Sequence, residues 1–212
     1  MKSLLTVILT AVVGAGCAAE ASSLPYYADR TFTPHWTTID HSVTSHVLAD
    51  TPFVDQTGRA FSPADLAGRI HVASFIFTTC ASICPPLVSS LKKVQAAMEG
   101  TDVLLVSYSI TPDIDTVDVL AAFGRERGID PARWRLLTGT SAGVQRVARD
   151  LYFADEDGSR ATIVDTEAFL HSEKLLLVDD TGHIRGVYNG TQPFEVQKLV
   201  EDVNTLRLTD HP

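Results

Sequence analysis

The clearest hydrophobic run in the chain extends from Ile70 to Phe77, and its β-branched and aromatic content predicts a buried strand. From Leu87 onward the apolar positions change to helical spacing, which continues through Leu91 and Val94 on one face. The sequence T-T-C-A-S-I-C-P-P joins the two segments, and its two prolines suit the first turn of a helix. The pattern therefore predicts a two-cysteine loop between a buried strand and a helix N-terminus.

Short apolar runs and amphipathic segments alternate along the rest of the chain. We expect a turn between two short strands within residues 53–61, further strands at 102–110, 134–137, 174–178 and 184–188, and a weak strand at 161–164. We expect helices ending near residues 127, 151 and 206, the first capped by Asp115 or Thr116, the second by Ser141 and the third opened by Pro193. This order predicts an α/β fold with a central mixed sheet, helices on both faces and an N-terminal β-hairpin extension.

The N-terminus resembles a secretory signal. Met1-Lys2 is basic, an apolar stretch too short to span a bilayer in the usual way follows, and small residues then precede Cys17. A bacterial lipoprotein signal has this form, although Gly14 stands where Leu, Val or Ile is usual; ordinary cleavage after Ala21 is the alternative. We expect a signal peptide at 1–21, a tether at 22–48 and one folded domain at 49–208.

Composition and cysteine usage fit an envelope protein. The chain of 212 residues carries a net charge of −9, which argues against nucleic-acid binding. A lipidated Cys17 would tether it to the membrane of a bacterial cell envelope, facing the oxidising periplasm. Of the three cysteines, only Cys80 and Cys84 then remain in the domain. A bridge between them would close too short a loop to add much stability, so we expect a chemical role.

That role depends on the thiolate form of the pair. The free N–H groups and the dipole of a helix N-terminus favour thiolate over thiol at both cysteines, as redox chemistry and soft-metal binding require. Tight metal binding needs a further ligand, and the best candidate is His171, which lies just before the hairpin that we expect the strands at 174–178 and 184–188 to form. Two thiolates and one imidazole suit copper(I), can hold copper(II), and would also take zinc in vitro. We expect His71 and His183 to be structural or exposed, and the histidines of the tether to have no role.

Four motifs resemble the Sco/SenC family of copper chaperones: F-T-T-C-A-S-I-C-P, S-I-T-P-D-I-D-T, W-R-L-L-T-G and L-H-S-E-K-L-L-L-V-D-D-T-G. The resemblance runs from about Phe53 to Leu206. It implies a thioredoxin-like fold and copper bound by Cys80, Cys84 and His171. It also implies a role in assembling the binuclear copper centre of cytochrome c oxidase, by donating copper or by reducing the oxidase cysteines. The implied partner is the copper-bearing oxidase subunit or another copper chaperone.

An enzyme is the alternative: a thiol–disulfide reductase or thiol peroxidase that uses Cys80 and Cys84, which would form a disulfide when oxidised. Thioredoxin-type oxidoreductases usually separate their cysteines by two residues, whereas three intervene here. They also place a cis-proline opposite the cysteines, and this chain has no proline between Pro131 and Pro193. Both features favour metal binding. One departure from the family pattern is Thr111, where many members have Asp before Pro; we expect little effect on copper.

Overall fold

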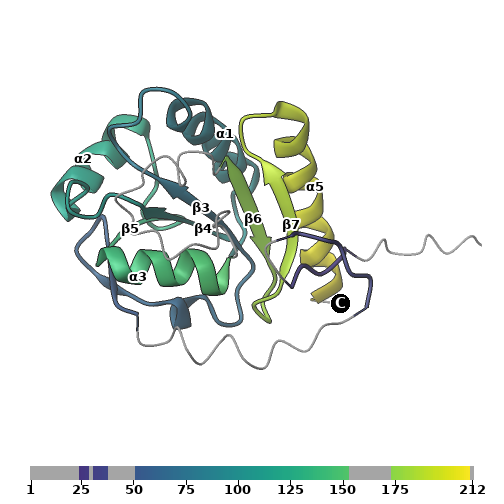
Figure 1. Cartoon of the computed structure of the whole chain (residues 1–212). Coiled ribbons are helices and arrows are strands. Elements are labelled where there is room, and N and C mark those ends of the chain that lie inside the picture. The colour runs from purple at the N-terminus through teal and green to yellow at the C-terminus, as the bar shows by residue number, and fades with distance from the viewer. Residues whose placement is uncertain (1–23, 29–30, 38–50, 153–172, 211–212) are drawn as a thin grey trace, which may run out of the picture.

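A seven-stranded sheet with the order β2-β1-β5-β4-β3-β6-β7 forms the centre of the molecule (Figure 1). The structure, a computed structural model, describes residues 24–28, 31–37, 51–152 and 173–210. The strands are β1 Phe53–Asp55, β2 Ala60–Phe61, β3 His71–Ile76, β4 Leu104–Ser109, β5 Trp134–Thr138, β6 Lys174–Val178 and β7 Ile184–Asn189. The helices are the 3₁₀ turn η1 Pro63–Leu66, α1 Cys84–Ala97, α2 Val117–Arg127, α3 Ser141–Arg146 with the π turn η2 Val147–Leu151, and α5 Pro193–Asp210.

The sheet is mixed. Strands β3, β4 and β5 run parallel, while β6 is antiparallel to β3, β7 to β6, β1 to β5 and β2 to β1. Helices α1, α2 and α5 bury their apolar residues on one face of the sheet, and α3 with η2 covers the other. Figure 1 shows α1 and α5 on the same side of the molecule, where they are in contact. This arrangement confirms the predicted α/β class with helices on both faces.

The predicted elements are present within the described residues, and the differences concern their ends. Thr116 caps α2 through a hydrogen bond from the Val119 N–H, which leaves Asp115 for another role. Thr140 caps α3, so the expected cap at Ser141 is wrong by one residue; Ser141 is already helical. The weak strand expected at 161–164 lies outside the described residues. No helix in the described part of the chain has the length and apolarity to cross a membrane.

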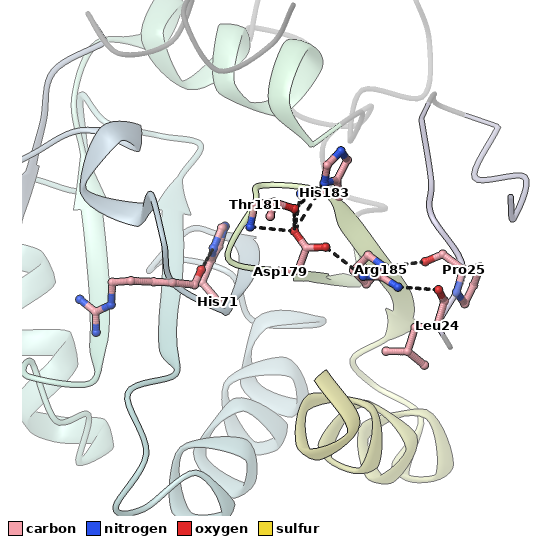
Figure 2. A network of polar contacts seen from close by, with 8 residues as sticks. Leu24, Pro25, His71, Asp179, Thr181, His183 and Arg185 are labelled. Carbon is pink, nitrogen blue, oxygen red and sulfur yellow. Dashed lines mark hydrogen bonds and ion pairs between the residues drawn. The ribbon is translucent and has the colours of Figure 1, made fainter. Parts of the chain in front are cut away.

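The beginning of the described chain is attached to the sheet edge at β7. Tyr27 forms an antiparallel bridge with Ile184, and the Arg185 guanidinium donates hydrogen bonds to the Leu24 and Pro25 carbonyl oxygens at 2.7 and 3.1 Å (Figure 2). The same guanidinium pairs with Asp179 at 3.0 Å. Part of the predicted tether thus packs on the domain, which the sequence did not indicate because these contacts join residues some 160 positions apart.

His71, at the start of β3, is a buried structural histidine. Its Nδ1 lies 3.2 Å from the Arg69 carbonyl oxygen, an acceptor, so Nδ1 carries the proton. Nε2 then accepts from the Tyr152 hydroxyl at 3.2 Å. Burial lowers the pKa of His71 to about 4, against which the hydrogen bond to Arg69 and the charge of Asp179 act only in part. The fold therefore holds this histidine in its neutral form.

We predict that His71 makes the protein sensitive to acid. The pKa is about 4 in the folded chain and about 6.5 in the unfolded chain. The unfolded state therefore binds more protons in this window, so stability is intact above pH 6.5 and falls as the pH drops toward 4. The loss attributable to His71 is about 2–3 kcal/mol. Urea unfolding of wild type and His71→Gln at pH 7.5 and 4.5 measures it. Equal pH-dependent losses in both proteins would contradict the prediction.

Candidate metal centre

The two cysteines lie where β3 passes into α1. β3 ends at Ile76, a short loop carries Cys80, and Cys84 is the first residue of the helix. Cys84 is therefore helical, whereas the sequence placed it in the loop. Pro85 and Pro86 occupy the first turn, as predicted. The Cys84 N–H lies 3.3 Å from the Cys80 Sγ atom and donates to it, so the two residues are in direct contact.

The Cys80 thiol is favoured as thiolate. Its side chain is half-buried, and both cysteines are free thiols in this structure. Partial burial raises the pKa of Cys80, but hydrogen bonds from the backbone N–H groups of Cys84, Ser82 and Ile83 outweigh it, so the pKa is lowered overall. Two of these donors, the Ile83 and Cys84 N–H groups, lie at the start of α1, where backbone N–H groups have no partner within the helix. The predicted effect of the helix N-terminus is confirmed for this cysteine.

For Cys84 the same prediction is wrong in the metal-free protein. Its side chain belongs to the hydrophobic cluster that includes Leu87 and Leu175. Burial raises the pKa of Cys84 to about 12, and the neighbouring Cys80 and the charge of Asp115 act in the same direction against a backbone hydrogen bond from Phe77. The pair therefore combines a half-exposed, reactive sulfur with a buried, protonated one.

We predict that alkylation separates the two thiols. The pKa of Cys84 is about 12 and that of Cys80 lies below the ordinary thiol value, so the thiolate fractions differ by roughly 1000-fold or more at neutral pH. Iodoacetamide at pH 7, followed by peptide mass spectrometry of the reduced, metal-free protein, should label Cys80 and leave Cys84 unlabelled. Unfolded protein, in which both react, provides the control. Similar alkylation rates at Cys80 and Cys84 in the folded protein would show that the two thiols do not differ in reactivity.

Asp115 joins the cysteine loop to the segment after β4. This carboxylate is fully buried; it accepts hydrogen bonds from the Thr78 N–H at 3.2 Å and from the Ser109 and Thr111 hydroxyls at 2.6 and 3.2 Å. The Thr78 hydroxyl also donates to it. Sequence reasoning considered Asp115 only as a helix cap. The available signal was the polar run after β4, because the carboxyl ends of parallel strands meet at one edge of a sheet.

The entry to β6 lies at the same edge. β3 and β6 pair antiparallel, with His71 opposite Val178 and Ala73 opposite Leu176. Continuing this register places Glu173 opposite Ile76, where the cysteine loop begins. Leu175, the second residue of β6, belongs to the same hydrophobic cluster as Cys84, so the beginning of this strand lies at the same end of the sheet as the cysteine loop. His171, two positions before Glu173, lies outside the described residues, as does Cys17.

Copper(II) at this site would need a ligand beyond the two sulfurs, whereas two thiolates alone can hold copper(I). Within residues 24–28, 31–37, 51–152 and 173–210, no group of three or more His, Cys, Asp or Glu side chains could hold a metal ion. The Cys80 and Cys84 side chains interact with each other, and a pair of thiolates fits a soft cation, for which thiolate is the preferred ligand. The Asp115 carboxylate already accepts hydrogen bonds from four donors, through which it stabilises the cysteine loop. The assignment of His171 as third ligand remains a prediction.

One family of known proteins matches this chain over most of its length. The family model for SCO1/SenC matches residues 39–207. A candidate copper-binding protein of Stutzerimonas stutzeri is 31% identical over 139 residues, which cover 63% of this chain and 64% of the relative.

Two solved structures are similar over most of the domain. A SCO1/SenC family lipoprotein from Bacillus anthracis aligns with a TM-score of 0.61 and 28% identity, over 74% of this chain and 92% of its own. BsSco, a member of the Sco family of cytochrome c oxidase assembly proteins in which a disulfide switch was identified, aligns with a TM-score of 0.61 and 26% identity, over 73% and 90%. With a family model spanning most of its length and this shared thioredoxin-like fold, the chain belongs to the SCO1/SenC family.

Proposed function

We propose that this protein is a copper metallochaperone of the bacterial cell envelope that assists assembly of the binuclear copper centre of cytochrome c oxidase. The observation that carries the proposal is the contact of two cysteines at the N-terminus of α1, where Cys80 Sγ accepts from the Cys84 N–H and the two thiol side chains interact. His171 completes the site. The family membership supports the same cargo, since a relative is described as a candidate copper-binding protein and BsSco belongs to a family of oxidase assembly proteins.

The difference in exposure and in thiol pKa between Cys80 and Cys84 suits the capture and release of copper. Cys80 is the first ligand, because it is the more exposed and the more acidic of the two. Cys84 follows and loses its proton as the second sulfur is engaged, so binding weakens at low pH. Release to the copper-bearing oxidase subunit, or exchange with another copper chaperone, proceeds by replacing one protein sulfur at a time with a partner ligand. Oxidation of the pair to a disulfide removes both ligands.

The proposed location follows from Cys17. Lipidation of this residue would anchor the protein on the periplasm-facing side of a membrane. Leu24 is seven positions later, and its carbonyl oxygen is held by Arg185 on the domain. Seven residues span at most about 25 Å. An anchored Cys17 would therefore keep the copper-binding domain close to the membrane in which an oxidase resides.

A thiol–disulfide reductase or thiol peroxidase is the second candidate, and the same asymmetry favours it. A half-exposed thiolate at Cys80 can attack a disulfide and form a mixed disulfide, releasing one thiolate. Cys84 then gives up its proton, attacks Cys80 and releases the second substrate thiolate. The substrate disulfide gains two electrons while the pair becomes a Cys80–Cys84 disulfide. This reaction could also prepare oxidase cysteines for copper.

Copper titration of the reduced protein, followed by absorption and EPR spectroscopy, tests the proposal. We expect one equivalent to bind, with an intense thiolate-to-copper(II) charge-transfer band. His171→Ala should weaken copper(II) binding more than copper(I) binding, because two thiolates alone can hold copper(I). His35→Ala, which removes an exposed histidine, is the matched control. Equal losses for both oxidation states in competition titrations would exclude His171 as a ligand.

The same titration separates the two functions. Stoichiometric binding that depends on both cysteines supports the chaperone. If copper does not bind stoichiometrically and the protein rapidly turns over a disulfide or peroxide substrate, the protein is an enzyme and the chaperone function is excluded.

A further inference from the structure

We propose that the N-terminal segment made of residues 24–28 and 31–37, here called the aromatic strap, contacts the lipid bilayer through Trp36. The inference rests on the proposed function, in which Cys17 anchors the protein to a membrane, and adds a second membrane contact made by the folded domain. Trp36 is 69% exposed, although tryptophan side chains are highly buried on average. Its ring is therefore available to a partner outside the domain.

The composition of the aromatic strap is typical of a membrane interface. Aromatic residues make up 8% of the whole chain, but four of the twelve residues of the strap are aromatic: Tyr26, Tyr27, Phe32 and Trp36. The twelve residues include no Asp, Glu, Lys or Arg. Proteins concentrate Trp and Tyr at the boundary between lipid and water, where the ring is buried in apolar groups and its polar atom meets water. An uncharged aromatic segment therefore fits a bilayer surface.

The domain holds the strap in a fixed position. Tyr26 and His35 exchange two backbone hydrogen bonds, at 2.7 and 2.9 Å, which pair the two arms of the strap. The Arg185 guanidinium, which also binds two carbonyl oxygens of the strap (Figure 2), lies over the Tyr26 ring at 3.9 Å from its centroid. The inner arm, residues 24–28, is buried or half-buried on the domain, whereas residues 33–37 of the outer arm are all exposed.

Trp36 lies where the chain enters the domain. The antiparallel pairing of the two arms places Trp36 beside Pro25, eight positions after the proposed anchor Cys17. A membrane that holds Cys17 is therefore close to the exposed outer arm. Because the anchor keeps the strap near the lipid, the second contact is intramolecular in effect, and a single aromatic side chain is sufficient to make it.

A bilayer contact at the strap also determines which way the cysteines face. Tyr27 forms a bridge with Ile184 at the start of β7. Ile184 pairs with Val178, which in turn pairs with His71 at the start of β3. The cysteine loop follows the other end of β3, about 20 Å away along the six residues of this strand. The strap and the cysteine loop thus lie at opposite ends of the sheet, and lipid at the strap leaves the cysteine loop open to a partner.

Tryptophan fluorescence tests the contact, because the chain has two tryptophans and Trp134 is fully buried. The difference between the spectra of wild type and Trp36→Ala isolates the emission of Trp36. The full-length protein is bound to vesicles of equal parts phosphatidylcholine and phosphatidylglycerol. Relative to the vesicle-free protein, we expect the emission of Trp36 to shift to the blue and its quenching by iodide to fall by about threefold or more, since the ring enters the interface. Lipids brominated close to the headgroup should quench it.

An exposed aromatic residue at the other end of the sheet provides the matched control. Phe194, in the first turn of α5, is 79% exposed. Phe194→Trp in the Trp36→Ala background places a tryptophan of similar exposure away from the strap. Its emission on vesicles should stay unshifted, and iodide should quench it as strongly as it does in solution.

The vesicle experiment separates this inference from the proposed function. If the protein floats with the vesicles while the emission of Trp36 stays unshifted and open to iodide, the anchor holds the protein without the strap and the proposal is overturned; the exposed ring would then serve a protein partner. Equal blue shifts for Trp36 and for Phe194→Trp would also overturn it, because exposure alone would explain lipid contact. Absence of flotation would overturn the membrane location itself, whereas the copper site is tested independently by titration.

Discussion

Replacing Cys84 with serine is expected to abolish tight copper binding in both oxidation states, and replacing Cys80 should do the same. Each substitution removes one of the two adjacent sulfurs and leaves a hydroxyl, a hard ligand that stays protonated at neutral pH. Structural zinc sites with four ligands, taken as a guide, have apparent binding free energies of about 10–16 kcal/mol, or about 3 kcal/mol per ligand. The loss should therefore be at least about 100-fold. Competition titration with a copper(I) chelator measures it.

The cysteine loop itself provides a control. Ala81→Ser adds a hydroxyl at an exposed position between the cysteines and removes no sulfur. Its affinity should match that of the wild type. High copper affinity retained in either serine variant at Cys80 or Cys84 would refute the assignment of the site.

The second large effect is expected at Asp115. Asp115→Ala leaves the Thr78 N–H and the Ser109 and Thr111 hydroxyls without their buried acceptor. Each unsatisfied buried group costs about 1–3 kcal/mol; Ser109 is buried and Thr78 and Thr111 are half-buried, so we expect a loss of about 3 kcal/mol. For a domain of this size that lowers Tm by about 6–12 °C. Calorimetry of the reduced, metal-free protein provides the measurement.

Asp115 also influences the thiol beside it. Its negative charge raises the pKa of Cys84, so Asp115→Asn, which keeps the shape and loses the charge, should lower that pKa. The thiolate absorbance of Cys84 should then appear at lower pH in an alkaline titration. Asp113→Ala removes a nearby exposed carboxylate and should change neither Tm nor the titration. If Asp115→Ala and Asp113→Ala have the same Tm, the hydrogen-bond network at Asp115 does not support the loop.

Much of the fold could be predicted because its signals are local. Three local signals each specify structure within a few residues: the apolar run before the cysteines, Pro85 and Pro86 at the start of α1, and the short turn sequence between the strands expected at 174–178 and 184–188. Element ends were less certain, since both Thr140 and Ser141 have the chemistry of a cap and only their backbone angles distinguish them.

The electrostatic character of the site could not be predicted in the same way. Position at a helix N-terminus favours thiolate for both cysteines, but the packing of Cys84 reverses the effect there. Asp115 reaches Thr78 across 37 residues of sequence, through the adjacency of β3 and β4. The attachment of Tyr27 to β7 is likewise a contact between distant segments.

By itself the sequence determined the α/β class, the position of the cysteine pair beside a helix N-terminus, and the family resemblance, because these depend on residue type and short spacing. His171 and Cys17, together with the boundaries at 1–21, 22–48 and 49–208, remain sequence-based predictions. Only the tertiary structure decided which cysteine is reactive, which carboxylate supports the loop and that Leu175 of β6 packs in the same hydrophobic cluster as Cys84. Burial and hydrogen bonding set these properties, and both depend on which distant strands the fold makes neighbours.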